Sequence, residues 1–111
     1  MSLSFQKFLE VDIRVGTINK AELTTKNIKP AIKVWIDFGT RIGIKKSSAQ
    51  ITKYYSPSKL IGRQVTAVIN LPPRQISTFM SEVLILGFPD SNGEVSLLIP
   101  DIEVPNGGRL F

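Results

Sequence analysis

The sequence contains no cysteine and no histidine, and these two absences exclude much of the chemistry that enzymes and metal sites use. Without cysteine there is no disulfide, no thiolate metal site and no cysteine nucleophile. Without histidine the usual general base and the commonest transition-metal ligand are both missing. The nine acidic residues show no paired spacing, and neither a Walker phosphate loop nor a GxGxxG motif is present. We therefore expect a protein that is not an enzyme and that uses no cofactor or metal. An enzyme whose carboxylates meet only in the fold is the alternative.

Long apolar runs are also missing. The longest, residues 83–88, falls far short of the roughly 20 residues that cross a bilayer, and no charged start followed by an apolar stretch marks a signal peptide. The 111 residues, 42% of them hydrophobic, are enough for one core. We expect a single domain over residues 1–111, located in the cytoplasm and not inserted in a membrane.

Acidic residues are scarce in the middle of the chain. Residues 26–74 contain ten basic residues and one acidic residue, Asp37, which gives this segment a net charge of +9. Residues 1–25 have a net charge of zero, and residues 75–111 have one of −4. Such a basic segment is a candidate binding surface for a polyanion, and the alternative is a solvated lysine-rich face.

The apolar pattern along the chain predicts mainly strands. Residues 11–18, 32–38 and 64–71 alternate apolar and polar side chains, and two further apolar segments flank the turn sequence PDSNGE. Short helices are expected after Ser4, a capping residue, and over residues 57–61. The alternation changes phase between Gly16 and Ile18, which predicts a bulge, and again between residues 45 and 48, which predicts a kink. Five or six short strands with two small helices favour an all-β OB-fold, a five-stranded barrel that binds oligonucleotides.

Four segments carry a more specific signal. In order and spacing, DIRVGTI, IDFGTRIGIKKSSAQIT, VINLPPRQISTFMSEVLILG and PNGGRLF resemble the tRNA-binding-domain family, and within it the export-related chaperones of the CsaA type. The family also includes the C-terminal domain of many methionyl-tRNA synthetases. The resemblance covers nearly the whole chain, from about Phe5 to Phe111. It implies an OB-fold, a homodimer, binding of folded tRNA and, for the CsaA branch, binding of unfolded or presecretory polypeptides.

Several residues are candidates for nucleic-acid binding. The resemblance matches Ser48, Asn70 and Ser81 to polar positions of the family motifs. Arg74 follows two prolines that stiffen its loop, and its guanidinium suits phosphate. Lysines supply attraction that does not depend on base sequence. The predicted set is Lys33, Lys45, Lys46, Ser48, Lys53, Asn70, Arg74 and Ser81. For Asn70 and Ser81 the alternative is capping at strand ends.

Apolar residues outside the expected core indicate two further contacts. Trp35 lies on the polar side of its strand, while Phe79 and Met80 lie in a polar loop, so we expect these three residues to bind polypeptide. The alternatives are a dimer contact for Trp35 and a loop packed onto the barrel for the other two. The chain ends are too apolar to be frayed, which predicts a dimer interface formed by Phe5, Phe8, Leu9, Leu110 and Phe111.

The function that these observations favour is that of a CsaA-like chaperone for unfolded or presecretory polypeptides that also binds tRNA. The main alternative is a stand-alone tRNA-binding protein without chaperone activity. The sequence leaves open which ligand matters more and whether both bind at one surface.

Overall fold

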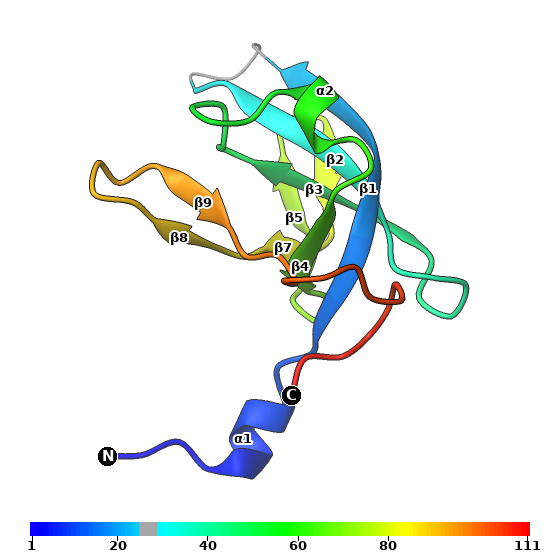
Figure 1. Ribbon diagram of the computed structural model, residues 1–111, viewed down its shortest axis with the longest axis vertical. Helices are drawn as coiled ribbons and strands as arrows, with labels where there is room; N and C mark the ends of the chain where they lie inside the picture. The colour runs from blue at the N-terminus through cyan, green and yellow to red at the C-terminus, as the bar shows by residue number, and fades with distance from the viewer. Residues whose placement is uncertain (25–28) are drawn as a thin grey trace.

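A curled five-stranded sheet forms the body of the protein in the computed structural model, which describes residues 1–24 and 29–111 (Figure 1). The strand order is β3-β2-β1-β4-β7, and the bounds are Ile13–Thr24 for β1, Ala31–Asp37 for β2, Ile44–Ala49 for β3, Gln64–Val68 for β4 and Leu84–Ile85 for β7. All the neighbouring strands pair antiparallel. This half-barrel confirms the predicted all-β, OB-like fold.

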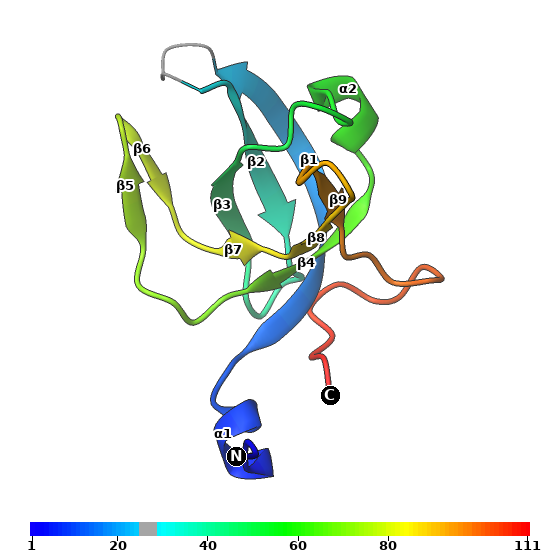
Figure 2. The ribbon, with the colours of Figure 1, turned by 90° about the vertical axis from the view of Figure 1, so that its left-hand side faces the viewer.

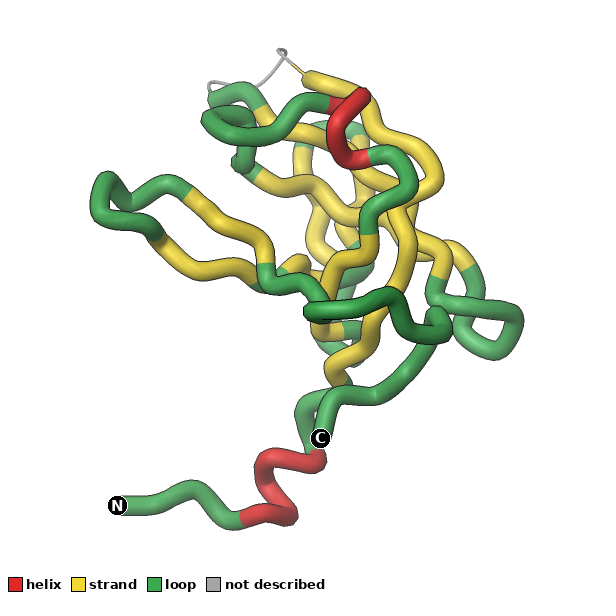
Figure 3. Tube along the Cα trace, viewed as in Figure 1, coloured by secondary structure: helices red, strands yellow, loops and turns green. Residues whose placement is uncertain are grey.

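Two hairpins and two short helices are attached to this sheet. One hairpin pairs β5 (Arg74–Ile76) with β6 (Phe79–Ser81), and the other pairs β8 (Gly87–Pro89) with β9 (Val95–Leu97). The first lies beside β3 in Figure 2, and the second extends away from the sheet, to the left in Figures 1 and 3. Helix α1 (Phe5–Leu9) stands away from the barrel, whereas α2 (Pro57–Leu60) covers one end of it (Figure 1). Both helices begin where the sequence predicted, and the Ser4 hydroxyl accepts a hydrogen bond from the Lys7 N–H at 3.2 Å.

The core lies on the concave side of the sheet, and β2 shows how the sequence places it there. Ile32, Val34 and Ile36 are fully buried, while the residues between them remain partly exposed. This is the alternation that the sequence predicted, since successive strand residues point to opposite faces. Burial of each such side chain contributes about 1.5–3 kcal/mol to stability.

Strand β1 has a bulge, but it lies after the predicted position between Gly16 and Ile18, where the pairing is regular. The register with β2 shifts between Ile18 and Lys20, so one residue is left over on β1. Just before the bulge Gly16 passes so close to β2 that a Cβ atom would lie 2.6 Å from the Ile36 side chain and 2.9 Å from the Asp37 carbonyl oxygen. Only glycine allows this approach, and the resulting bend lets one strand pair with both β2 and β4.

The predicted kink between residues 45 and 48 is wrong. Strand β3 pairs with β2 in an unbroken register from Ile44 to Ala49. The core-facing position in the middle of β3 is occupied by Ser47, which is buried and donates a hydrogen bond to the Val83 carbonyl oxygen at 2.8 Å. Because Ile44 is exposed on the other face, the apolar pattern changes phase although the backbone does not.

The two ends of the chain leave the barrel together. The Asn70 side chain accepts a hydrogen bond from the Asp12 N–H at 3.0 Å and donates one to the Glu10 carbonyl oxygen at 2.7 Å. Near the other terminus the Arg109 guanidinium donates to the Leu9 carbonyl oxygen. The Asn70 bonds hold the segment after α1 against the residues that follow β4, and the Arg109 bond holds it against the C-terminal segment.

The turn between β5 and β6 generates a prediction about stability. Ser77 has φ of 56° and is the only described residue other than glycine with a positive φ. A non-glycine residue in this region costs about 1–3 kcal/mol, and glycine avoids that cost at an entropic penalty of about 0.5–1 kcal/mol. We therefore expect Ser77→Gly to raise the free energy of unfolding by up to about 1 kcal/mol, measured by urea denaturation. The matched control is Thr78→Gly, which has the same entropic penalty without relief of strain and should destabilise. A Ser77→Gly protein no more stable than Thr78→Gly would contradict the assignment of strain.

Candidate nucleic-acid interface

Basic and aromatic side chains gather on the outer side of β2 and β3. Lys33 lies opposite Ser48 in the register of these strands, and Trp35 lies opposite Lys46. Directly paired residues of antiparallel strands share a face, so these four side chains form one surface, which we call the basic face. In OB-folds this face and the loops beside it bind oligonucleotides.

The β5–β6 hairpin is packed against the basic face through an aromatic contact. The rings of Phe79 and Trp35 meet edge to face, with centroids 5.7 Å apart and an interplanar angle of 78°. Phe79 is only 7% exposed, whereas its neighbour Met80 is 38% exposed. The hairpin also carries Arg74, which is exposed and pairs with Ser81. The contact therefore brings the guanidinium-bearing hairpin to the edge of the lysine-bearing strands.

Three lysine ammonium groups lie over these two rings. The Nζ atoms of Lys33 and Lys46 are 5.0 and 5.2 Å from the centroid of Phe79, and that of Lys20 is 4.6 Å from the centroid of Trp35. These distances fall within the range of cation–π interactions. Lys20 was missed by the sequence reasoning because the bulge in β1 reverses the alternation just before it and places it opposite Trp35.

Two of the polar residues predicted to contact nucleic acid, Ser48 and Ser81, form a hydrogen bond with each other. The Ser81 hydroxyl, which is mostly buried, accepts a hydrogen bond from the Ser48 N–H at 3.1 Å. Next to it the Glu82 carboxylate accepts one from the Lys46 N–H at 3.0 Å, and the Glu82 N–H donates to the Lys46 carbonyl oxygen at 2.8 Å. Ser48 and Ser81 thus lie at the basic face and also join β3 to the segment after β6. Their contact with nucleic acid remains a prediction.

The other predicted nucleic-acid residues lie elsewhere. Lys45 is opposite Ile36 and so lies on the core side of β3, at its open end. Lys53 lies beside a cleft at the far end of the strands, and the amide of Asn70 is bonded to the N-terminal segment. Lys26, which also contributes to the basic segment, lies outside the described residues. The structure thus brings together Lys33, Lys46, Ser48, Arg74 and Ser81 and separates the rest.

The residues predicted to bind polypeptide lie at and beside the basic face. Trp35 is a partly exposed member of that face, Phe79 is buried against it, and Met80, the next residue of β6, is exposed on the other side of the hairpin. For Phe79 the structure has the alternative arrangement, a loop packed onto the barrel. A polypeptide site built on Trp35 and Met80 would overlap the basic face.

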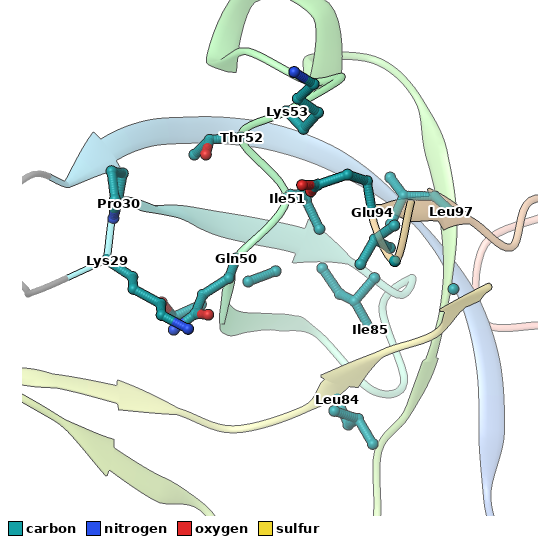
Figure 4. Close-up of a pocket in the computed structure, with 15 residues that line it drawn as sticks. Lys29, Pro30, Gln50, Ile51, Thr52, Lys53, Leu84, Ile85, Glu94 and Leu97 are labelled. Carbon is teal, nitrogen blue, oxygen red and sulfur yellow. The ribbon is translucent and has the colours of Figure 1, made fainter. Parts of the chain in front are cut away.

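The structure also contains a cleft that the sequence analysis did not predict. A cleft of about 940 Å³ lies between residues 50–53, β7 and the β8–β9 hairpin (Figure 4). Ile51, Ile85 and Leu97 line it, and the charged residues Lys29, Lys53 and Glu94 also contribute to its lining. Its lining comes from segments that are distant in the sequence, so no local motif marks it.

A tyrosine–carboxylate pair lies next to this cleft. The Tyr54 hydroxyl donates a hydrogen bond to the Asp90 carboxylate, which raises the pKa of the tyrosine and lowers that of the aspartate. Asp90 also accepts the N–H groups of Asn92 and Glu94 at 2.8 and 2.9 Å, so its charge organises the β8–β9 turn. Both side chains are engaged in holding the turn.

Within residues 1–24 and 29–111 no group of three or more acidic side chains is placed to hold a metal ion. None of the helices in the same ranges is long and apolar enough to span a membrane.

Comparison with known proteins gives a consistent result. The family model described as a putative tRNA binding domain matches residues 13–109. The methionine–tRNA ligase of Porphyromonas gingivalis is 36% identical over 108 residues, which are 97% of this chain and 15% of the ligase. That of Methanothrix thermoacetophila is 38% identical over 105 residues, again 15% of the ligase. The chain thus spans about 15% of the length of these curated relatives.

Solved structures match over their whole length. The chaperone CsaA of Bacillus anthracis is 47% identical, with a TM-score of 0.93 and complete coverage of both chains. CsaA of Picrophilus torridus is 44% identical, with a TM-score of 0.89 and coverage of 99% of this chain and 100% of that one. A protein from Pyrococcus horikoshii described as MetRS related is 28% identical, with a TM-score of 0.86 and complete coverage of both chains. The chain therefore belongs to the tRNA-binding-domain family, and its structural neighbours within that family include the CsaA chaperones.

Proposed function

We propose that this protein is a CsaA-like molecular chaperone without catalytic activity, a cytoplasmic homodimer that binds unfolded or presecretory polypeptides during export and also binds tRNA. The observation that carries the proposal is the full-length similarity to two CsaA chaperones, at 47% and 44% identity. The basic face supplies the chemistry for the nucleic-acid part of the function.

Binding of tRNA would depend on the charge of the basic face. Lys33 and Lys46 lie side by side on it, and Arg74 extends from the adjacent hairpin. Phosphate contacts dominate the affinity of proteins for nucleic acids and make it dependent on salt. Folded RNA is recognised largely through its shape and its backbone, which suits a rigid surface of cationic groups.

We expect tRNA binding to weaken steeply with salt. If four to six phosphates are neutralised, the logarithm of the association constant should fall against the logarithm of the salt concentration with a slope of roughly −3 to −5. Lys46→Ala combined with Arg74→Ala should weaken binding about tenfold or more and make the slope shallower by about 1.5. Fluorescence anisotropy with labelled tRNA measures both quantities.

The matched control is Lys59→Ala, an exposed lysine on α2 at the end of the barrel. It removes a charge outside the basic face and should leave the slope nearly unchanged. All these variants should melt close to the parent protein because the altered residues are not buried. A flat salt response, or equal losses in the Lys59 control and the double variant, would rule out tRNA binding at this face.

A chaperone role requires apolar surface as well as charge. The exposed Met80 and the partly exposed Trp35 provide such surface beside the lysines, and a flexible thioether suits varied partners. The rival function is that of a stand-alone tRNA-binding protein. It is favoured by the similarity to the MetRS-related protein of Pyrococcus horikoshii, with which the chain aligns over the full extent of both chains.

Competition between the two ligands separates these functions. Because Trp35 belongs to the basic face and Met80 lies on the adjacent hairpin, an unfolded polypeptide bound at these residues should displace labelled tRNA as its concentration rises. The unfolded probe is a second protein that has been reduced and carboxymethylated, and the native form of that second protein is the control. Failure of the unfolded probe to bind would favour the rival function, and binding without displacement of tRNA would show that the polypeptide site lies elsewhere.

The proposed dimer would be formed by the two ends of the chain. Phe5 is 68% exposed, Leu9 40%, Leu110 38% and Phe111 103%, and Phe8 is partly exposed. Pairing two copies about a twofold axis would bury these groups symmetrically. It would also place two basic faces on one particle, which raises the avidity for a long polypeptide or a large RNA.

Sedimentation tests the dimer. The intact protein should sediment at about twice the mass of one chain, and Phe5→Asp combined with Phe8→Asp should produce monomers, because the charges would be buried at the interface. The control is Phe88→Asp, since Phe88 is 60% exposed on the β8–β9 hairpin, far from the termini. A parent protein that sediments as a monomer at micromolar concentration would contradict the proposal.

A further inference from the structure

The aromatic rings at the basic face are in contact with lysine side chains. Proteins that bind single-stranded nucleic acids commonly stack bases on exposed aromatic rings. In this protein Phe79 is 7% exposed, and its ring lies close to the ammonium groups of Lys33 and Lys46. The ring of Trp35 lies close to the ammonium group of Lys20. The two rings therefore contact lysines and each other, and Trp35 alone is partly exposed.

This arrangement orders side chains that are otherwise flexible. A lysine has four rotatable side-chain bonds, and fixing them when a ligand binds costs conformational entropy. Phe79 gathers the ammonium groups of two neighbouring strands around one ring, at 5.0 Å for Lys33 and 5.2 Å for Lys46. Groups that are already held near their bound positions lose less entropy on binding.

The two lysines on Phe79 also lack a negative partner. Within the described residues neither Lys33 nor Lys46 has a carboxylate within the 4.0 Å of an ion pair. The nearby carboxylates are engaged otherwise. Glu22 pairs with Lys20 at 3.4 Å, Asp37 accepts the Gly39 N–H at 2.8 Å, and Glu82 accepts the Lys46 N–H at 3.0 Å. Two like charges gathered at one ring repel each other, and a bound anion would relieve that repulsion.

We infer that Phe79 and Trp35 are positioning residues of a phosphate site, in which the Lys33 and Lys46 ammonium groups bind the RNA backbone and Lys20 extends the site along β1. This inference rests on the proposed tRNA binding and names the part of the RNA that the face contacts. The rings act through the lysines and do not stack on bases. The face consequently recognises backbone phosphates with little dependence on base sequence.

Substitutions at Phe79 separate positioning from charge. Phe79→Leu keeps an apolar side chain but removes the ring, so tRNA should bind about five- to tenfold more weakly, because two lysines must be ordered on binding. The salt slope should stay the same because no charge is lost. Phe79→Tyr keeps the ring and should bind within about twofold of the parent protein. Lys33→Gln, which removes one phosphate contact, should instead make the slope shallower by about 0.7 to 0.9.

Nuclear magnetic resonance reports the positioning itself. Protons next to the ammonium groups of Lys33 and Lys46 should show ring-current shifts in the parent protein and in Phe79→Tyr, and should lose them in Phe79→Leu. The Ser48 N–H, which donates to Ser81, is the internal control that the hairpin remains in place. Absent shifts in the parent protein, or equal tRNA affinity in Phe79→Leu and Phe79→Tyr, would overturn the inference.

Inorganic pyrophosphate distinguishes failure of the inference from failure of the proposed function. At low salt it should perturb the Lys33 and Lys46 signals of the parent protein, and more weakly those of Phe79→Leu. If tRNA does not bind but pyrophosphate does so at these lysines, the proposed function fails and the phosphate site stands. If tRNA binds while pyrophosphate leaves both signals unchanged, the phosphate site is wrong. The fluorescence of Trp35, the single tryptophan, adds a check, since strong quenching by oligouridylate would mean base stacking and contradict the inference.

Discussion

The closure of the barrel at β3 is the constraint on which the rest of the structure depends. An edge strand leaves backbone N–H groups without a neighbouring strand. Here the N–H groups of Lys46 and Ser48 are satisfied by the side chains of Glu82 and Ser81. These bonds replace a regular strand pair, so the chain is free to leave the sheet and form the β5–β6 hairpin next to β3. The hairpin in turn brings Phe79 to Trp35 and creates the basic face.

Residues at this closure can affect both the position of the hairpin and the binding of a ligand. Ser48 and Ser81 resemble binding residues of the family, yet each is also part of the seam between β3 and the hairpin. Loss of the Ser81 hydroxyl would remove this bond and alter the position of the hairpin as well as any contact with a ligand, whereas Ser48 contributes its backbone N–H, which a change of its side chain leaves in place. The tRNA affinity of a Ser81 variant is therefore informative only beside a measurement that the hairpin keeps its position. Variants of Lys33 and Arg74 report on ligand binding more directly, because within the described residues neither side chain forms a hydrogen bond that holds the fold together.

Local patterns in the sequence predicted most of the fold and about half of the candidate site. The alternation of Ile32, Val34 and Ile36 was sufficient to place the core, and Lys33 and Trp35 on the opposite face followed from it. The kink in β3 was predicted wrongly because a serine can fill a core position when its hydroxyl donates a hydrogen bond to a carbonyl oxygen. The apolar periodicity of a sequence gives no sign of such a bond. Lys20 was missed because its position depends on a bulge that is defined by pairing with another strand. The cleft beside the β8–β9 hairpin was missed for a similar reason, since its walls come from distant segments.

Asn70 connects the two regions that the proposed function requires. Its amide holds the segment that follows α1, and the chain that leaves Asn70 reaches Arg74 after only three residues, two of which are prolines. Proline fixes the backbone φ angle, so the position of Asn70 constrains the position of the hairpin more tightly than it would through a flexible linker. In a dimer formed through the chain ends, the orientation of α1 and the placement of Arg74 would share the same anchor. The spacing between the two basic faces of such a dimer would then be fixed by the protein rather than by the ligand, and that favours ligands long enough to reach both.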